Sequence, residues 1–274
     1  MDYIEARVTA PEALREPVMA LMAEAGFMAF EETDTGILGY VEAAAYEPER
    51  LTAQLALLPG PAVEWQIREV PGQNWNAYWE SNYPSVQVDR LCQVVPSFRE
   101  PEPGFRYTLR IDPKMSFGTG HHETTRLMMR QLDLLPVQGA QVLDMGCGTG
   151  ILAILAWKMG AASVTGIDID SWCMENAAEN AAINSTPLRL IQGDASAIPD
   201  EAYSMILANI TCNILLADLH AYAARLAPGG WLVLSGFYET DVPQLAGRAA
   251  ELGLLPVRTL EENRWTALAF RQPG

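Results

Sequence analysis

The chain has 274 residues, of which 49% are hydrophobic, so it can bury a sizeable core, and disorder is excluded as its main state. Its 18 Lys and Arg residues against 34 Asp and Glu residues give a formal net charge of −16. That sign disfavours binding to free DNA or RNA, because such binding depends on neutralising phosphate groups.

The cysteines and the start of the chain indicate the compartment. Cys92, Cys147, Cys173 and Cys212 form no CxxC pair, which argues against both a disulfide framework and a zinc site. Residues 1–17 carry acidic side chains where a signal peptide has a basic region, and no stretch of about 18 residues is apolar enough to span a membrane. We therefore expect a cytoplasmic protein that does not bind membranes.

Residues 1–70 are predicted to form a small domain. Ile4, Ala6 and Val8 alternate with polar residues, as in a half-buried strand. The expected elements, in chain order, are a strand at residues 3–8, a helix at 11–25, strands at 27–31 and 37–41, a helix at 48–58 and a strand at 63–70. This β-α-β-β-α-β order predicts an α+β ferredoxin-like domain. Since it contains no His, no Cys and no glycine-rich loop, we expect a substrate-recognition domain.

Residues 71–84 are predicted to form a linker helix between two domains. Trp75 and Trp79 are four residues apart and therefore lie on one face of such a helix. Pro71 and Pro84 bound the segment. We expect the two tryptophans to pack against a domain.

Residues 85–274 are predicted to form an α/β domain, because from residue 107 onward strands alternate with helices, as in βαβ units. The expected strands are at residues 141–144, 163–168, 188–192, 205–208 and 231–235, and the expected helices are at 151–159, 171–184, 212–226 and 241–252. Residues 256–260 and 265–270 are expected to form an antiparallel hairpin. The pattern predicts a Rossmann-like parallel sheet.

A glycine-rich loop follows the first strand of this domain. Gly146, Gly148 and Gly150 stand at alternate positions, so the chain can turn tightly and a ligand can approach its backbone. The spacing is G-x-G-x-G rather than the G-x-G-x-x-G of dinucleotide-binding proteins. Asp144, just before the loop, is expected to put a carboxylate near the ligand, which favours a cationic group over a pyrophosphate.

Two further aspartates follow the next strands. Asp168 ends the second strand, where an acidic side chain can accept hydrogen bonds from both hydroxyls of a ribose. Asp194 follows the third strand and is expected near the adenine edge. Together with the glycine loop, they indicate an adenosine-bearing ligand without phosphates, namely S-adenosylmethionine.

Asn209 ends the fourth strand, at the carboxyl edge of the sheet. Methyltransferases that act on planar nitrogens usually have Asn-Pro-Pro-Tyr or Asp-Pro-Pro-Tyr at this place, and here Ile210 and Thr211 replace the prolines. A planar amide nitrogen is therefore disfavoured as the methyl acceptor. We expect Asn209 to direct the lone pair of an amine at the methyl group, with no dedicated general base.

These residues resemble the bacterial ribosomal protein L-eleven methyltransferase (PrmA) family over nearly the whole chain. The most specific match is residues 111–125, Ile-Asp-Pro-Lys-Met-Ser-Phe-Gly-Thr-Gly-His-His-Glu-Thr-Thr, which is similar to the family segment I-D-P-G-x-A-F-G-T-G-T-H-P-T-T. The aromatic linker, the glycine loop, the segment around Asp168, the segment around Asn209 and residues 228–236 also match in order.

The resemblance implies a class I S-adenosylmethionine-dependent methyltransferase (Rossmann-like) domain after a small N-terminal domain that grips L-eleven. It also implies that Thr125, Gly146, Asp168 and Asn209 contact S-adenosylmethionine. The loop at residues 117–120, which contains Thr119, covers the methionine part in the family. Gly148 and Asp194 complete the set of expected cofactor-binding residues.

Three residues depart from the family pattern, and all lie in the loop over the cofactor: Lys114, His121 and Glu123. They put the conformation of the loop in question rather than the reaction. Adjacent His121 and His122 point to opposite sides, and no third strong ligand has a suitable spacing, so we predict no metal site. His122 is expected to orient the loop.

We predict an S-adenosylmethionine-dependent protein N-methyltransferase that modifies lysine side chains, the N-terminal amine, or both, of ribosomal protein L-eleven of the large subunit. We expect it to act as a monomer. The alternatives are a methyltransferase of another protein, a small-molecule amine or a nucleic acid, a non-catalytic protein that only binds the cofactor, and a dehydrogenase.

Overall fold

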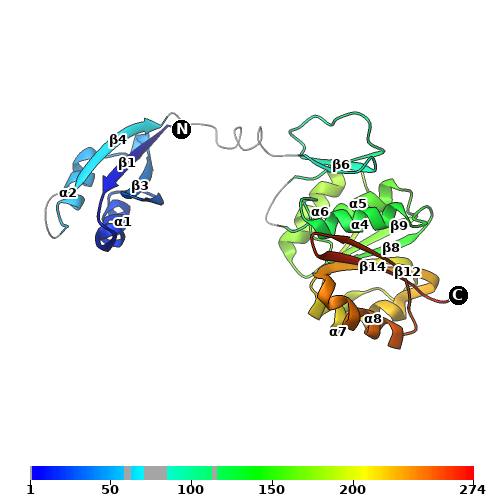
Figure 1. Ribbon diagram of the computed structural model, residues 1–274. Helices are drawn as coiled ribbons and strands as arrows, with labels where there is room; N and C mark the ends of the chain where they lie inside the picture. Colours follow the sequence, from blue (N-terminus) through cyan, green and yellow to red (C-terminus); the bar gives the residue numbers. More distant parts are fainter. Residues whose placement is uncertain (1, 59–62, 71–84, 113–115) are drawn as a thin grey trace. The chain divides into compact units, whose positions relative to one another are not determined.

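The computed structural model describes residues 2–58, 63–70, 85–112 and 116–274 and divides the chain into two compact units, Met1–Tyr83 and Pro84–Gly274 (Figure 1). The linker helix predicted at residues 71–84 lies outside the described residues. Within the described ranges, no helix is both long and apolar enough to cross a lipid bilayer.

The described part of the Met1–Tyr83 unit is an antiparallel sheet with the strand order β2-β3-β1-β4 and two α-helices. Its elements are β1 (Tyr3–Thr9), η1 (Glu12–Leu14), α1 (Arg15–Glu24), β2 (Ala29–Thr33), β3 (Gly36–Glu42), η2 (Ala43–Ala45), α2 (Pro48–Leu55) and β4 (Glu64–Val70). The alternating Ile4, Ala6 and Val8 of β1 are buried with Met22 of α1 and Leu51 of α2. The first helix begins later than predicted, because η1 forms a separate 3-10 turn after Pro11.

The Pro84–Gly274 unit is built on a seven-stranded mixed sheet with the order β10-β9-β8-β11-β12-β14-β13. Its main elements are α4 (Glu123–Asp133), β8 (Gln141–Met145), α5 (Ile151–Lys158), β9 (Ser163–Asp168), α6 (Ser171–Ile183), β10 (Arg189–Gln192), η3 (Ala195–Ala197), β11 (Tyr203–Asn209), α7 (Cys212–Arg225), β12 (Leu226–Tyr238), η4 (Glu239–Asp241), α8 (Val242–Glu251), β13 (Leu255–Glu262) and β14 (Trp265–Arg271). Strands β8 to β12 pair in parallel, whereas β13 and β14 form the predicted antiparallel hairpin.

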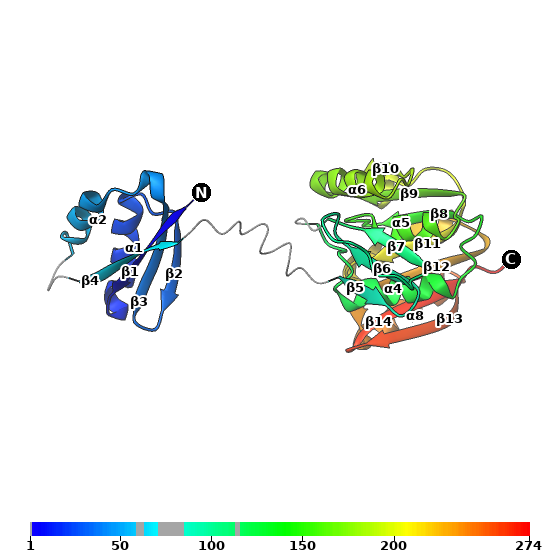
Figure 2. The same ribbon diagram turned by 90° about the horizontal axis from the view of Figure 1, so that it is seen from above.

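Helices cover both faces of this sheet (Figure 1). Helices α4, α5 and α6 lie on one face, and α7 and α8 lie on the other. Figure 2 shows the hairpin β13–β14 at one edge of the sheet and β10 with α6 at the opposite edge. The resulting three-layer arrangement leaves the carboxyl ends of the parallel strands as the edge where a ligand can bind.

The sequence pattern did not predict four elements of this unit. Three short strands, β5 (Val86–Val88), β6 (Cys92–Val95) and β7 (Tyr107–Arg110), form a separate small sheet. They have three or four residues each, which is too short for an alternating pattern to stand out. Helix α4 was also missed, because its first residues were assigned to the loop over the cofactor.

Candidate functional site

A cavity of about 570 Å³ lies at the carboxyl ends of β8, β9 and β11. This volume is in the range of sites that hold a small molecule or a cofactor. The loops that follow the strands, the start of α6, one face of α7 and the start of β14 line it. The lining residues are Phe117, His122, Thr124, Met145, Gly146, Gly148, Asp168, Ile169, Asp170, Trp172, Cys173, Gly193, Asp194, Ala195, Asn209, Ile210, Thr211, Ile214, Asp218, Tyr222, Gly236 and Trp265.

The loop after β8 requires glycine because of its backbone angles and its close neighbours. The φ angles are +66° at Gly146, +53° at Gly148 and +76° at Gly150, a region that L-residues rarely adopt. A Cβ atom on Gly148 would lie only 2.4 Å from the carbonyl oxygen of Phe117. The backbone N–H of Thr149 donates to that same carbonyl at 3.0 Å. The segment around Phe117 therefore rests directly on the glycine loop and closes one side of the cavity.

We expect Gly148→Ala to destabilise the protein by roughly 1–3 kcal/mol, because the new Cβ combines an unfavourable φ with a clash against Phe117. Urea denaturation would measure the loss. Gly139→Ala is the matched control, since Gly139 has a φ of +76° and nothing within 4 Å of a Cβ position. If both substitutions lower the free energy of unfolding equally, the contact with Phe117 does not cause the loss of stability in Gly148→Ala.

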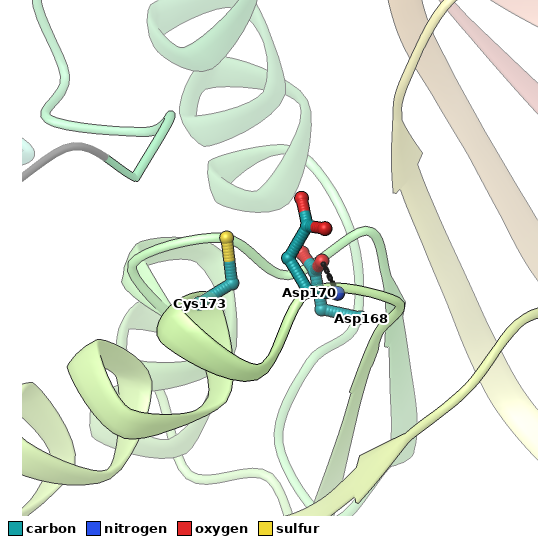
Figure 3. Close-up of side chains that lie close together, drawn as sticks. All are labelled: Asp168, Asp170 and Cys173. Carbon is teal, nitrogen blue, oxygen red and sulfur yellow. Dashed lines mark hydrogen bonds between the residues drawn. The ribbon is translucent and has the colours of Figure 1, made fainter.

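Asp168 stands at the end of β9, and its carboxylate joins the glycine loop to the start of α6. One carboxylate oxygen accepts a hydrogen bond from the backbone N–H of Gly148 at 2.8 Å, and the other accepts from that of Asp170 at 3.1 Å (Figure 3). Asp168 is buried yet lines the cavity. Each oxygen keeps a free lone pair, so the side chain can still accept hydrogen bonds from a ligand.

Asp194 lines the same cavity from the loop after β10 and is exposed. It caps η3, where one carboxylate oxygen accepts from the backbone N–H of Ser196 at 2.9 Å and from its hydroxyl at 2.6 Å. These hydrogen bonds hold the pKa of Asp194 below its usual value. The carboxylate is therefore charged and fixed in orientation at neutral pH.

Asn209 lies at the end of β11 and lines the cavity. Its amide nitrogen donates to the hydroxyl of Thr125 at 3.4 Å. Its amide oxygen is buried and has no hydrogen-bond partner among the described residues. Thr125 itself is fully buried in α4, and its neighbour Thr124 lines the cavity instead. An unpaired buried acceptor is costly, so the Asn209 oxygen indicates that a ligand supplies a donor here.

Asp144 was expected near the ligand, and this expectation is wrong, because Asp144 does not line the cavity. It is fully buried at the end of β8, and its carboxylate accepts from the backbone N–H of Ala153, in the first turn of α5, at 3.1 Å. Burial raises the pKa of Asp144 to about 7. The side chain therefore supports the glycine loop from behind and can exchange a proton near neutral pH.

Thr119 and His121 lie in the loop that precedes α4. Thr119 lines a second cavity of about 470 Å³, which shares Phe117 and His122 with the first. Its hydroxyl lies 3.1 Å from Nδ1 of His121. Glu123 also lines the second cavity. The Asn263 side chain donates a hydrogen bond to its carboxylate, which lowers the pKa of Glu123. His121 and Glu123, two of the residues that depart from the family pattern, thus line a cavity next to the main one, and Lys114 lies outside the described residues.

His122 connects the loop to α4. Nδ1 of His122 accepts from the backbone N–H of Thr124 at 3.2 Å and so caps the helix. Its ring lies 5.3 Å from that of Phe117 and 4.6 Å from that of Trp265, measured between centroids. These contacts fix the path of the chain from the loop into the helix.

Asp168, Asp170 and Cys173 form a group whose potential metal ligands lie within 4.8 Å of one another (Figure 3). Desolvation raises the pKa of the Cys173 thiol, so the thiolate that binds metals is disfavoured at neutral pH. Both oxygens of Asp168 already hold backbone N–H groups. The group lies between the end of β9 and the start of α6, and the absence of a metal site there stays a prediction.

Several cavity residues could not be found from the sequence. Trp265 reaches the cavity from the start of β14, and Ile214, Asp218 and Tyr222 reach it from α7 at helical spacing. In the sequence, Trp265 reads as an ordinary strand residue of the hairpin. The α7 residues likewise read as one face of an amphipathic helix.

Within the described part of the chain, the charged residues that line the cavity are of one sign. Four of these lining residues are aspartates and none is Lys or Arg: Asp168, Asp170, Asp194 and Asp218. A pyrophosphate would be repelled by this lining, whereas a cationic ligand would be attracted. The cavity therefore suits a positively charged nucleoside without phosphates.

The chain matches the family described as ribosomal protein L11 methyltransferase (PrmA) over residues 16–273. It is 44% identical to a ribosomal protein L11 methyltransferase of Porphyromonas gingivalis over 264 residues, which are 94% of this chain and 91% of that protein. A ribosomal protein L11 methyltransferase of Phocaeicola vulgatus is 41% identical over 279 residues, which are 98% of this chain and 99% of that protein.

Two solved structures share the fold. A ribosomal protein L11 methylase from Lactobacillus delbrueckii subsp. bulgaricus is 32% identical, with a TM-score of 0.66, over 70% of this chain and 100% of that one. A methyltransferase from Pyrococcus furiosus is 20% identical, with a TM-score of 0.53, over 61% of this chain and 90% of that one. The second shows likeness of fold only.

Proposed function

Because the chain belongs to the ribosomal protein L11 methyltransferase (PrmA) family, we propose that it methylates amino groups of ribosomal protein L11 with S-adenosylmethionine. The Pro84–Gly274 unit has the mixed α/β fold of S-adenosylmethionine-dependent methyltransferases. The observation that carries the proposal is the cavity at the carboxyl edge of its sheet. Among the residues that the structure describes, four aspartates and no Lys or Arg line it. The same lining argues against a dehydrogenase, because a dinucleotide carries a pyrophosphate.

The residues of the cavity fit S-adenosylmethionine. Gly146 and Gly148 line the cavity with backbone atoms alone, so a ligand can approach their backbone closely. Asp168 offers free lone pairs to two ribose hydroxyls, and the ionised Asp194 can accept from the adenine amino group. The unpaired amide oxygen of Asn209 provides an acceptor at the remaining side.

We assign cofactor binding to Gly146, Gly148, Asp168 and Asp194 through direct contact. Thr125 contributes by holding the amide nitrogen of Asn209, which leaves the amide oxygen as the group presented to the cavity. Thr119 belongs to the loop whose Phe117 lines the cavity, and we assign it to that covering loop.

Methyl transfer needs a neutral amine whose lone pair points at the methyl group. S-adenosylmethionine supplies a methyl group already activated by the positive sulfur. A lysine amine with a pKa of about 10.4 is rarely neutral at pH 7, and an apolar surrounding lowers this pKa by disfavouring the charged form. Phe117 and Trp265 give the cavity an aromatic, apolar part of its wall, and the Asn209 oxygen can accept one N–H of the amine. The lone pair is then fixed in direction, which lowers the barrier by orientation.

We expect Asn209→Ala to lower kcat roughly 100-fold, because removing one oriented hydrogen-bonding group from a reacting centre has an effect of about this size. The dissociation constant of S-adenosylhomocysteine should change much less than kcat. Steady-state kinetics with L11 and calorimetric titration would separate the two. Thr211→Ala is the control, since Thr211 lines the same cavity two residues further on. A parent-like kcat for Asn209→Ala would remove Asn209 from the reaction.

The Met1–Tyr83 unit is the proposed substrate-recognition domain, of ferredoxin-like type. Its β-α-β-β-α-β order and its antiparallel strand order β2-β3-β1-β4 support this assignment. We propose that L11 is bound there while its amines reach the cavity of the second unit. We also propose a monomer that acts in the cytoplasm, where ribosomal proteins are available, and that does not bind free nucleic acid, as its net charge of −16 suggests.

Incubation of the full chain with labelled S-adenosylmethionine and unmethylated L11 tests the proposed function. We expect label in L11 and, after proteolysis, in peptides that carry modified amines. Labelling of bulk RNA or of small amines in a cell extract, with L11 unlabelled, would favour the alternative substrates. Binding of the cofactor without any transfer would favour a non-catalytic protein.

A further inference from the structure

Three asparagines form a ladder with a spacing of one helical turn: Asn176 and Asn180 within α6, and Asn184 at its C-cap position. Asn176 and Asn180 are almost fully buried. Asparagine is a poor helix former, and burying its amide is favourable only when its hydrogen bonds are satisfied. The amide nitrogen of Asn176 has no partner among the described residues, so the hydrogen bonds of Asn180 and Asn184 show what the ladder holds.

Asn180 is the central member and binds two different segments of the chain. Its amide oxygen accepts from the backbone N–H of Asp112 at 3.1 Å. Its amide nitrogen donates to the backbone carbonyl of Thr149 at 3.0 Å and to the side-chain oxygen of Asn176 at 2.9 Å. Both N–H groups and the oxygen are thus used. Asn180 joins the chain just before the covering loop to the glycine loop.

Asn184 binds only the first of these segments. Its amide oxygen accepts from the backbone N–H of Arg110 at 3.0 Å, and its amide nitrogen donates to the Arg110 carbonyl at 2.6 Å and to the Asn180 carbonyl at 2.8 Å. None of its hydrogen bonds reaches the glycine loop. Asn184 is therefore a natural comparison for Asn180.

Thr149 continues the connection from the ladder to the wall of the cavity. Its hydroxyl donates to the carbonyl of Gly118 at 2.5 Å, and its backbone N–H donates to the carbonyl of Phe117 at 3.0 Å. Phe117 lines the cavity, whereas Thr149 and Asn180 do not. The carbonyl, the amide and the hydroxyl of Thr149 are all engaged, so its position determines where the Phe117–Gly118 backbone lies.

From these contacts we propose that Asn180 is a positioning residue for the cofactor site: through Thr149 it holds the Phe117–Gly118 segment against the glycine loop. The inference rests on the proposed function, because it concerns the same cavity. Asn180 cannot touch the cofactor from its place behind the glycine loop, and its effect is transmitted by the Thr149 backbone. The ladder also holds the segment of Arg110 and Asp112 beside α6. Asn184 binds Arg110, and Asn180 binds Asp112.

The test compares Asn180→Ala with Asn184→Ala in the full chain. We expect Asn180→Ala to raise the dissociation constant of S-adenosylhomocysteine about tenfold and to raise the KM for S-adenosylmethionine in parallel, with a smaller change in kcat. Asn184→Ala should change the dissociation constant less than about twofold even where it lowers the melting temperature. Equal dissociation constants for both variants would reduce the ladder to a purely structural role and overturn the proposal.

If circular dichroism shows that Asn180→Ala does not fold, Asn180→Asp tests the same connection. Aspartate keeps the shape of the side chain and the acceptor for the Asp112 N–H but loses the donor to the Thr149 carbonyl. A weaker S-adenosylhomocysteine complex supports the proposal, and a parent-like one overturns it. The binding measurement needs no methyl acceptor, so a parent chain that binds S-adenosylhomocysteine but leaves L11 unmodified contradicts the proposed function and not this inference.

Discussion

Asp168→Ala is expected to weaken S-adenosylhomocysteine binding roughly a thousandfold, because hydrogen bonds from ribose hydroxyls to a charged acceptor contribute about 1.5–3 kcal/mol each, and the variant loses two. It also loses the acceptor for the Gly148 and Asp170 N–H groups, so the glycine loop is no longer tied to β9. Both losses act in the same direction. Isothermal titration of the full chain measures the change, and urea denaturation shows whether the variant is folded.

Asp170→Ala is the control for charge. Asp170 lines the same cavity and neighbours Asp168, but in Figure 3 its carboxylate accepts no hydrogen bond from the residues drawn. We expect its removal to change the dissociation constant less than about tenfold, as for one nearby charge in a solvated cavity. If the two variants weaken binding equally, the cavity attracts its ligand by net charge alone and Asp168 has no specific role.

Most of the second unit follows from sequence periodicity. Strands β8 and β9 were predicted at residues 141–144 and 163–168, and after an exposed first residue both are buried in the parallel sheet. Helix α4 was not predicted, because its first turn, Glu123-Thr124-Thr125, follows a loop rich in glycine and histidine. What starts this helix is a cap from the His122 side chain, and histidine is not a common capping residue.

The site could be predicted where its residues follow strands. Asp168, Asp194 and Asn209 all line the cavity, since the ends of neighbouring parallel strands meet at one edge. The direction of a side chain at such an end is not contained in the pattern. Asp144 shows this, because it precedes the glycine loop yet points to α5. Trp265 could not be found because its approach depends on the packing of β14 beside β12.

The buried carboxyl of Asp144 makes stability depend on pH. Its pKa is about 7 in the folded protein, against an ordinary value of 3.8. Between these values the unfolded chain gives up the proton while the folded chain keeps it, so the free energy of unfolding falls as the pH rises. Each pH unit between the two pKa values lowers the free energy of unfolding by about 1.4 kcal/mol, which gives a total loss of about 4 kcal/mol. This loss is fully present above pH 7 and absent below pH 3.8.

Asp144→Asn should remove this dependence, since asparagine stays neutral and its oxygen can still accept from the Ala153 N–H. We expect the free energy of unfolding of the variant, relative to the parent, to rise by about 3 kcal/mol between pH 5 and pH 8 in urea titrations. Asp194→Asn is the control, because hydrogen bonds from Ser196 hold the pKa of Asp194 low and its charge does not change in this range. If the difference in free energy of unfolding between Asp144→Asn and the parent did not change with pH, the Asp144 carboxyl would already be ionised at pH 5. The Ala153 N–H at the start of α5 would then stabilise the charged form.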